Sequence, residues 1–200
     1  AKATVTVEQT GATSDIGDLY IGEDGNAIGV IINKDEEKNK IYIISTEEKN
    51  TPFTDKDNYK IYVKTDYYDG QKALAQLKGE EDWETKFAIA AYCAELEERT
   101  KVKGWYIAAA YENGVWDALR ENETTINTVL SSINATELGA TQPDHPFFWT
   151  ATTDSRYFDV DKYIESIITK DKANQWENGF MMSTYDYIAR CVLKIEYLSE

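Results

Sequence analysis

Hydrophobic residues follow two different spacings along this chain, and the spacing changes twice. In the first third and the last quarter, short runs rich in isoleucine, valine and aromatic residues alternate with glycine-containing or charged segments. In the middle, apolar residues recur every three or four positions, as on one face of a helix. The pattern therefore predicts strands, then helices, then strands again.

The strands predicted near the N-terminal end are bounded by polar or glycine-containing segments. They cover residues 19–21, 28–32, 41–44 and 59–63. Asp24-Gly25 is a tight-turn signal between the first two strands. The run Ile28-Gly29-Val30-Ile31-Ile32 is almost continuously apolar, which is typical of a central strand buried on both faces.

The first residues of the chain have a different character. Residues 3–9 alternate between polar and apolar types like an edge strand, and a polar linker rich in glycine, serine and threonine follows them. We therefore divide the chain into an N-terminal strand and linker over residues 1–17 and one domain over residues 18–200.

The clearest helical pattern covers residues 82–98. Its apolar stripe consists of Trp83, Phe87, Ala90, Ala91, Ala94 and Leu96. Asp82 precedes the first of these residues and is the expected N-cap. Gly104 ends the turn after the helix, and residues 105–107 have the composition of a strand.

Two further helical segments flank this one. A short helix is predicted over residues 73–77, and a longer helical region covers residues 113–133. The polar stretch at residues 121–125 predicts a break of the longer region into two helices.

The C-terminal part of the chain returns to strand-like runs. Strands are predicted over residues 147–152, 164–169 and 187–195, with an acidic and amide-rich loop over residues 170–178. Because the helices lie together between two sets of strands, we predict an α+β fold with mostly antiparallel sheets.

Composition and charge exclude several classes of partner. The chain has 36 acidic and 21 basic residues, a formal net charge of −15, and no cluster of lysine and arginine. A surface that binds phosphate groups needs a basic patch, so nucleic acid and anionic membranes are not expected partners. No apolar run is long enough to span a bilayer, so membrane insertion is not expected.

Few residues of the chain suit metal binding or nucleophilic catalysis. The two cysteines are far apart and the chain contains one histidine, which makes a zinc site improbable. That residue, His145, lies between Pro143-Asp144 and Pro146, and no nucleophile is placed near it as in a known active-site motif. We therefore expect His145 to be a turn residue and the protein not to be an enzyme.

A series of short motifs is shared with one fold family. Their order along the chain is Ala27–Ile31, Tyr68-Asp69-Gly70, Ala91-Tyr92-Cys93, Gly104-Trp105-Tyr106, Ile126-Asn127, Phe148-Trp149-Thr150 and Ile188–Val192. This order resembles the C-type-lectin-like fold with its two main helices, in the bacterial versions common in secreted and surface proteins of Bacteroidetes. Ala108-Ala109 departs from the Pro-Ser of that family.

The resemblance implies a disulfide between Cys93 and Cys191, because in that fold the first helix is tied to the last strand. Such a bridge closes a loop of about 100 residues and contributes on the order of 4–5 kcal/mol in the chain-entropy model. It also implies an oxidising compartment, outside the cell or on its surface. The alternative is two separate buried thiols.

The resemblance also directs attention to residues 145–187, which carry the ligand-binding loops in that fold. Aromatic side chains with polar neighbours make rigid contacts, and Tyr157, Trp176 and Tyr185 are the expected ligand-binding residues. Trp149 is expected to be buried instead, on one face of a strand.

Calcium is the one cofactor for which the sequence offers ligands. Trp176-Glu177-Asn178 resembles the Trp-Asn-Asp triplet of sugar-binding C-type lectins, and Glu177 and Asn178 would supply oxygen ligands. The matching Glu-Pro-Asn segment is missing, so the alternative is a solvated acidic loop around a core tryptophan.

The function expected from these features is recognition without catalysis. The chain is predicted to be a secreted or cell-surface binding module whose ligand is a glycan or a protein. The alternative is a structural or adhesive surface component, such as a pilus-tip module. Residues 3–9 would then be an exposed donor strand.

Overall fold

The fold is described from a computed structural model. It covers residues 14–55, 63–141, 146–153 and 185–197, with the backbone alone at Asn113 and over 163–170 and 176–182. In this part of the chain the elements are β1 (Leu19–Ile21), β2 (Ala27–Asp35), β3 (Lys40–Ser45), β4 (Lys49–Thr51), α1 (Gly70–Lys78), α2 (Trp83–Lys86), α3 (Ala88–Thr100), α4 (Asn113–Ser132), β5 (Phe147–Trp149), β6 (Tyr163–Lys170), β7 (Trp176–Met182), β8 (Tyr187–Ala189) and β9 (Val192–Glu196). The predicted α+β class, with helices between two sets of strands, is confirmed.

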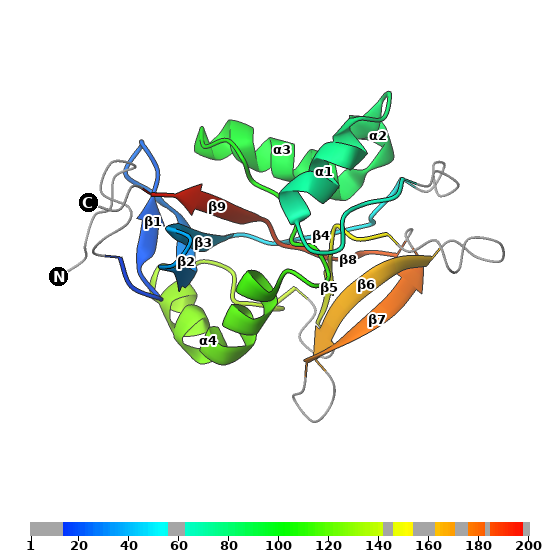
Figure 1. The fold of residues 1–200 in the computed structure, drawn as a ribbon. Coiled ribbons are helices and arrows are strands. Elements are labelled where there is room, and N and C mark those ends of the chain that lie inside the picture. The colour runs from blue at the N-terminus through cyan, green and yellow to red at the C-terminus, as the bar shows by residue number, and fades with distance from the viewer. Residues whose placement is uncertain are drawn as a thin grey trace.

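The strands form two sheets, and the helices lie on opposite sides of the molecule. The first sheet has the antiparallel order β1-β2-β3-β9, and the second has the order β4-β8-β5-β6-β7. In the second sheet β5 and β8 pair in parallel, and the other neighbours are antiparallel. Helix α4 packs below the first sheet, while α3 lies above β9, and α1 and α2 lie beside α3 towards the second sheet (Figure 1). As predicted, the run Ile28–Ile32 is buried in a central strand.

The C-terminal segment connects the two sheets. The predicted single strand over 187–195 is wrong, since β8 ends at Ala189 in the second sheet and β9 begins at Val192 in the first. Because the residues of β8 and of β9 both have strand composition, the hydrophobic pattern does not show that the chain passes from one sheet to the other. Arg190 and Cys191 form the junction between the sheets.

The predicted helix over residues 82–98 is interrupted near its beginning. Phe87 has an extended backbone (φ −119°, ψ 90°) and separates α2 from α3. Its ring is buried and meets the Phe53 ring edge-on, with centroids 6.5 Å apart. Asp82 is the N-cap residue of α2, as predicted, but it adopts a left-handed conformation and its side chain makes no capping hydrogen bond.

Helix α4, in contrast, is continuous, so the predicted break at residues 121–125 is wrong. Leu119, Ile126 and Leu130 keep one buried stripe across the polar stretch, because their spacing matches successive helical turns. The polar residues between them occupy exposed or half-buried positions.

Two other segments differ from the sequence prediction. Residues 105–107 form only an isolated bridge, between Tyr106 and Val192, although their side chains are buried. The predicted loop over 170–178 overlaps β7, which begins at Trp176 and pairs with β6 over its whole length. The strands predicted at residues 3–9 and 59–63 lie outside the described residues, except for Val63, and His145 lies outside them too.

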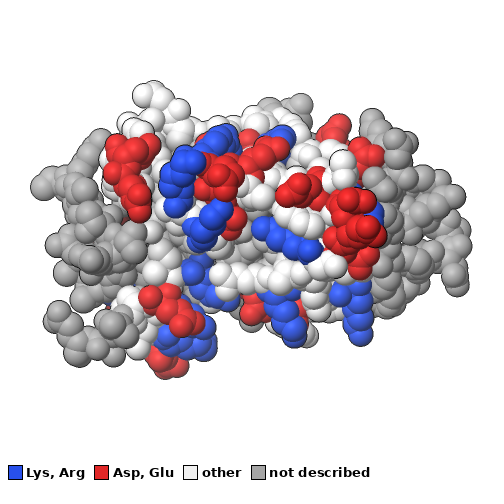
Figure 2. Space-filling model, turned by 90° about the horizontal axis from the view of Figure 1, so that it is seen from above, with Lys and Arg blue, Asp and Glu red and all other residues white. Residues whose placement is uncertain are grey.

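Charges of both signs cover the upper face of the molecule. Seen from above, lysine and arginine side chains alternate with aspartate and glutamate on this face (Figure 2). The net charge of −15 is therefore not gathered there into one acidic patch.

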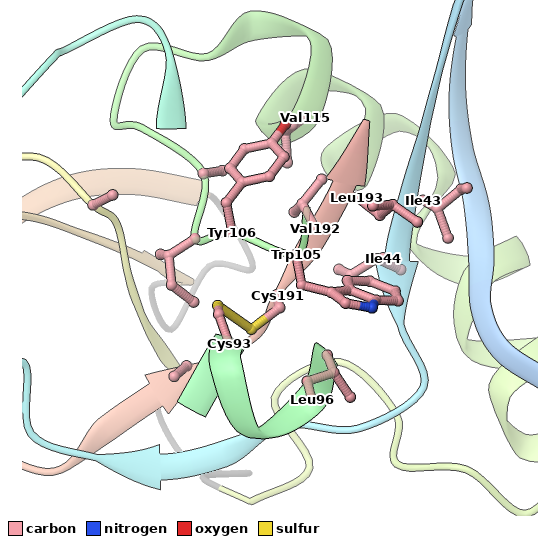
Figure 3. Packing of buried hydrophobic residues seen from close by; sticks show 14 of the residues in the cluster. Ile43, Ile44, Cys93, Leu96, Trp105, Tyr106, Val115, Cys191, Val192 and Leu193 are labelled. Carbon is pink, nitrogen blue, oxygen red and sulfur yellow. A yellow bond between two sulfur atoms is a disulfide. The ribbon is translucent and has the colours of Figure 1, made fainter. Parts of the chain in front are cut away.

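A disulfide joins Cys93 on α3 to Cys191 at the junction between the sheets, as predicted. The two Cα atoms are 6.1 Å apart, and both side chains are fully buried. The bridge lies in the core beside Trp105 and Leu96 (Figure 3). It fastens α3 to the point where the chain passes from one sheet to the other. Within the described residues, no helix is both long and apolar enough to cross a membrane.

Candidate functional site

The residues predicted to bind ligand do not form one site in the described structure. Tyr157 lies outside the described residues. Trp176, Glu177 and Asn178 belong to β7, where Glu177 pairs with Thr169 of β6 and Asn178 pairs with Ile168. Among the residues that the structure describes, no group of three or more histidine, cysteine, aspartate or glutamate side chains is arranged to hold a metal ion.

Tyr185 is the predicted contact whose side chain is described, and it is exposed to 49%. Its ring lies 6.1 Å from that of Tyr187, which in turn contacts Phe147 at 5.0 Å and Trp149 at 5.1 Å. Trp149 is buried, as predicted, and its indole N–H donates to the Thr51 carbonyl. Tyr185 is thus the outer end of an aromatic row that continues into the core.

A second aromatic group, which the sequence reasoning missed, is more exposed. Tyr67 and Tyr68 precede α1, and Tyr111 precedes α4; we call these three residues the tyrosine platform. The Tyr111 ring lies 6.3 Å from Tyr67 with an interplanar angle of 22°, and 5.8 Å from Tyr68 with an angle of 38°. Tyr68 is exposed to 73% and Tyr111 to 41%.

The loop that carries Tyr67 and Tyr68 is held by the carboxylate of Asp66. Its Oδ1 accepts from the backbone N–H of Tyr68 at 2.9 Å and of Asp69 at 3.0 Å, and its Oδ2 accepts from Lys72 Nζ at 2.7 Å. These hydrogen bonds hold the pKa of Asp66 below its ordinary value, and the bond from Lys72 has the largest effect. The loop therefore has a defined shape before any ligand arrives.

A buried carboxylate joins this loop to the one that carries Tyr111. Glu112 Oε2 accepts from the backbone N–H of Gly70 at 2.9 Å and of Ala109 at 3.0 Å, and Oε1 accepts from the Tyr106 hydroxyl at 2.8 Å. Glu112 is 6% exposed, and burial raises its pKa although the three hydrogen bonds act in the opposite direction. One side chain thus fixes the spacing of both tyrosine-bearing loops.

A third segment completes the support beneath the platform. The Thr152 hydroxyl accepts from the Ala110 N–H at 2.9 Å and donates to the Asp66 carbonyl at 3.3 Å. Thr153 and Thr65 exchange further buried hydrogen bonds through their hydroxyls and backbone N–H groups. Since buried polar groups in these three segments satisfy one another, the platform rests on a rigid base.

Two ion pairs lie beside the platform. Lys72 Nζ lies 2.7 Å from Asp66 Oδ2, and Lys194 Nζ lies 3.8 Å from Asp69 Oδ1. Asp69 also accepts from the Lys72 backbone N–H and caps α1. The platform therefore offers a ligand the exposed ring of Tyr68, with ion pairs beside it.

Another buried polar centre, at the junction between the sheets, has a structural role. All five N–H donors of Arg190 are used, on the Glu48 carboxylate at 2.9 Å and on the carbonyls of Ser45, Thr136 and Glu137. The Glu48 carboxylate also accepts from the backbone N–H groups of Gly139 and Thr141. This centre fastens residues 136–141 to both sheets.

A cleft of about 680 Å³ opens at the turn between β1 and β2. It is bounded by this turn, by Thr46 and Glu47 after β3, and by residues 132–136 after α4. Among the described residues that line it, none is aromatic and one is acidic, Glu47, which is paired with Arg99 at 2.8 Å. The cleft thus lacks the convergent reactive or aromatic groups that mark a specific site.

A scan against protein-family models, a search of curated proteins and a search of solved structures each found no match. The tyrosine platform is therefore the candidate site on its geometry alone. The one sequence signal for this site is the pair of tyrosines before the Asp69-Gly70 turn. Nothing in the sequence indicates that Tyr111 lies beside them.

Proposed function

We propose that this protein is a recognition module without catalytic activity, which binds its ligand on the tyrosine platform. The fold we propose for it is C-type-lectin-like. In support, the described elements give an α+β architecture in which a disulfide ties a helix to the C-terminal strands. The proposed ligand is a glycan or a protein displayed outside cells.

The observation that carries this proposal is the exposure of Tyr68 and Tyr111 on loops that buried hydrogen bonds hold in place. Tyrosine offers a large, rigid contact surface and loses little rotamer entropy on binding. A preformed site also avoids the cost of ordering loops when the ligand arrives. Exposed aromatic rings on a rigid base are accordingly typical of a binding surface.

The proposed location is extracellular or on the cell surface. The Cys93–Cys191 bridge supports it, because disulfides persist mainly in oxidising compartments. The alternative of a pilus-tip or adhesive component depends on residues 3–9, which lie outside the described residues, and no observation in the described part favours it.

The test is a binding screen of the full chain on two arrays, one of glycans and one of extracellular proteins. The wild type is compared with Tyr68→Ala/Tyr111→Ala, and with Tyr185→Ala as an exposed-tyrosine control from another part of the molecule. We expect at least one ligand that the double variant loses and the control retains. Equal binding by all three proteins on both arrays would contradict the proposed function.

A further inference from the structure

We infer that the ligand of the tyrosine platform is an uncharged saccharide, bound without a metal ion. This inference rests on the proposed function and narrows it to one chemical class. It also differs from the sequence expectation, which placed a possible calcium-dependent contact at Glu177 and Asn178.

The first argument is the shape of the aromatic surface. The Tyr111 ring is inclined by only 22° to Tyr67 and by 38° to Tyr68, with centroids about 6 Å apart in both pairs. Tyr68, at the outer end of this group, is exposed to 73%, so most of its aromatic ring and its phenol hydroxyl are accessible to a ligand. A sugar ring has a matching construction, with an apolar C–H face and hydroxyl groups around its rim.

The second argument is the state of the nearby cations. An acidic saccharide or a phosphorylated ligand needs lysine or arginine groups that are free to pair with it. Here Lys72 is already bound to Asp66 and Lys194 lies within ion-pair distance of Asp69. The net charge of −15 adds a general repulsion of anions. These charges favour a neutral ligand.

The third argument concerns calcium. Three carboxylates, those of Asp66, Asp69 and Glu112, are adjacent in sequence to a platform tyrosine. Asp66 accepts from two backbone N–H groups and an ammonium group, Asp69 accepts from the backbone N–H of Lys72, and Glu112 accepts from two backbone N–H groups and a phenol. A calcium ion needs six to eight converging oxygen ligands, and it would have to displace the bonds that shape the loop. Carboxylate lone pairs that remain can still accept hydrogen bonds from sugar hydroxyls.

The surroundings of the platform favour a saccharide over a protein partner. The centre of a protein–protein interface is usually depleted in charged residues. Four charged side chains, Asp66, Asp69, Lys72 and Lys194, occur in the ion pairs beside the platform. Among the described residues, the other exposed large hydrophobic side chains are Ile16 and Tyr185, on different segments of the chain.

The experiment is chemical acetylation of surface tyrosines with N-acetylimidazole, followed site by site by mass spectrometry on the full, oxidised chain. The probes are neutral oligomers of glucose, galactose, mannose and N-acetylglucosamine, with sulfated and uronate-containing oligosaccharides as the acidic arm. We expect at least one neutral oligomer to slow the acetylation of Tyr68 severalfold. Tyr185 is the internal control, and its rate should not change. Chelation of calcium and high salt should leave the protection intact.

Matched variants identify the interaction. Tyr68→Phe keeps the ring and should bind the protecting oligomer within a few-fold of the wild type, whereas Tyr68→Ala should bind it at least about tenfold more weakly. Tyr185→Ala should bind like the wild type.

Other outcomes overturn the inference in distinguishable ways. Protection by acidic oligosaccharides alone, its loss on calcium chelation, or no protection by any neutral oligomer would each overturn it. If the platform variants nevertheless lose a protein ligand on the arrays, the recognition function stands and only the saccharide class fails. If they lose no ligand there, the proposed function fails as well.

Discussion

The buried ion pair between Arg190 and Glu48 yields the sharpest prediction about stability. Both side chains are almost completely buried, at 2% and 0% exposure. Arg190→Met removes five N–H donors and keeps an unbranched side chain in the same space. Glu48 would keep its bonds from the backbone N–H groups of Gly139 and Thr141 but would lose its counter-charge.

The expected cost is about 3–5 kcal/mol of unfolding free energy, because removal of one partner leaves a charge buried and unpaired. For a domain of this size, that loss corresponds to a decrease in melting temperature of about 6–20 °C. The double variant Arg190→Met/Glu48→Gln should lose less unfolding free energy than the sum of the losses in the two single variants. The difference should be about 1–3 kcal/mol.

The measurement is urea unfolding followed by circular dichroism, with the disulfide kept oxidised. The matched control is Arg99→Met, since Arg99 and Glu47 form a pair of similar length (2.8 Å) with side chains exposed to 50% and 45%. The control should lose no more than about 1 kcal/mol, because solvent weakens an exposed pair. Equal losses in Arg190→Met and Arg99→Met, or strict additivity in the double variant, would refute the reasoning.

Three further predictions concern other parts of the core. Cys93→Ala/Cys191→Ala should lower the unfolding free energy by up to about 4–5 kcal/mol, since the bridge spans 98 residues; an unchanged urea midpoint would contradict this. The Tyr92 hydroxyl is buried without a hydrogen-bond partner among the described residues, and burial raises its pKa to about 12. Tyr92→Phe should therefore raise the unfolding free energy by about 1–2 kcal/mol, and a loss of stability would show that the hydroxyl has a partner. Burial raises the pKa of Glu112, so the folded state keeps this proton to higher pH than the unfolded chain does. We therefore compare the unfolding free energies of the wild type and Glu112→Gln by urea titration at several pH values. The wild-type value minus the variant value should increase as pH falls from neutral towards 4.5, and a decrease would contradict the raised pKa of Glu112.

The parts of the fold that the sequence predicts well depend on local patterns. The run Ile28–Ile32 is recognisable because a central strand is apolar on both faces. Trp149 is recognisable as a core residue from its place in a strand-like run. The bridge between Cys93 and Cys191 followed from the family resemblance, and the structure confirms it.

The parts that escape prediction depend on tertiary contacts. No periodicity distinguishes one strand from two strands in different sheets, so the junction at Arg190 was invisible in the sequence. The tyrosine platform depends on Glu112, whose carboxylate accepts a hydrogen bond from Gly70, 42 residues earlier in the chain. A glutamate before a helix is ordinary in sequence, and its role emerges only when Gly70 and Ala109 are seen beside it.

The central claim is that recognition takes place on the tyrosine platform. Its most direct test is the dissociation constant of the best array ligand for the wild type, Tyr68→Ala and Tyr185→Ala, measured side by side by isothermal titration. We predict that Tyr68→Ala weakens binding at least about tenfold, while Tyr185→Ala stays within about twofold of the wild type. The reverse order, with binding lost in Tyr185→Ala and kept in Tyr68→Ala, would contradict the claim and move the site to the aromatic row at β8.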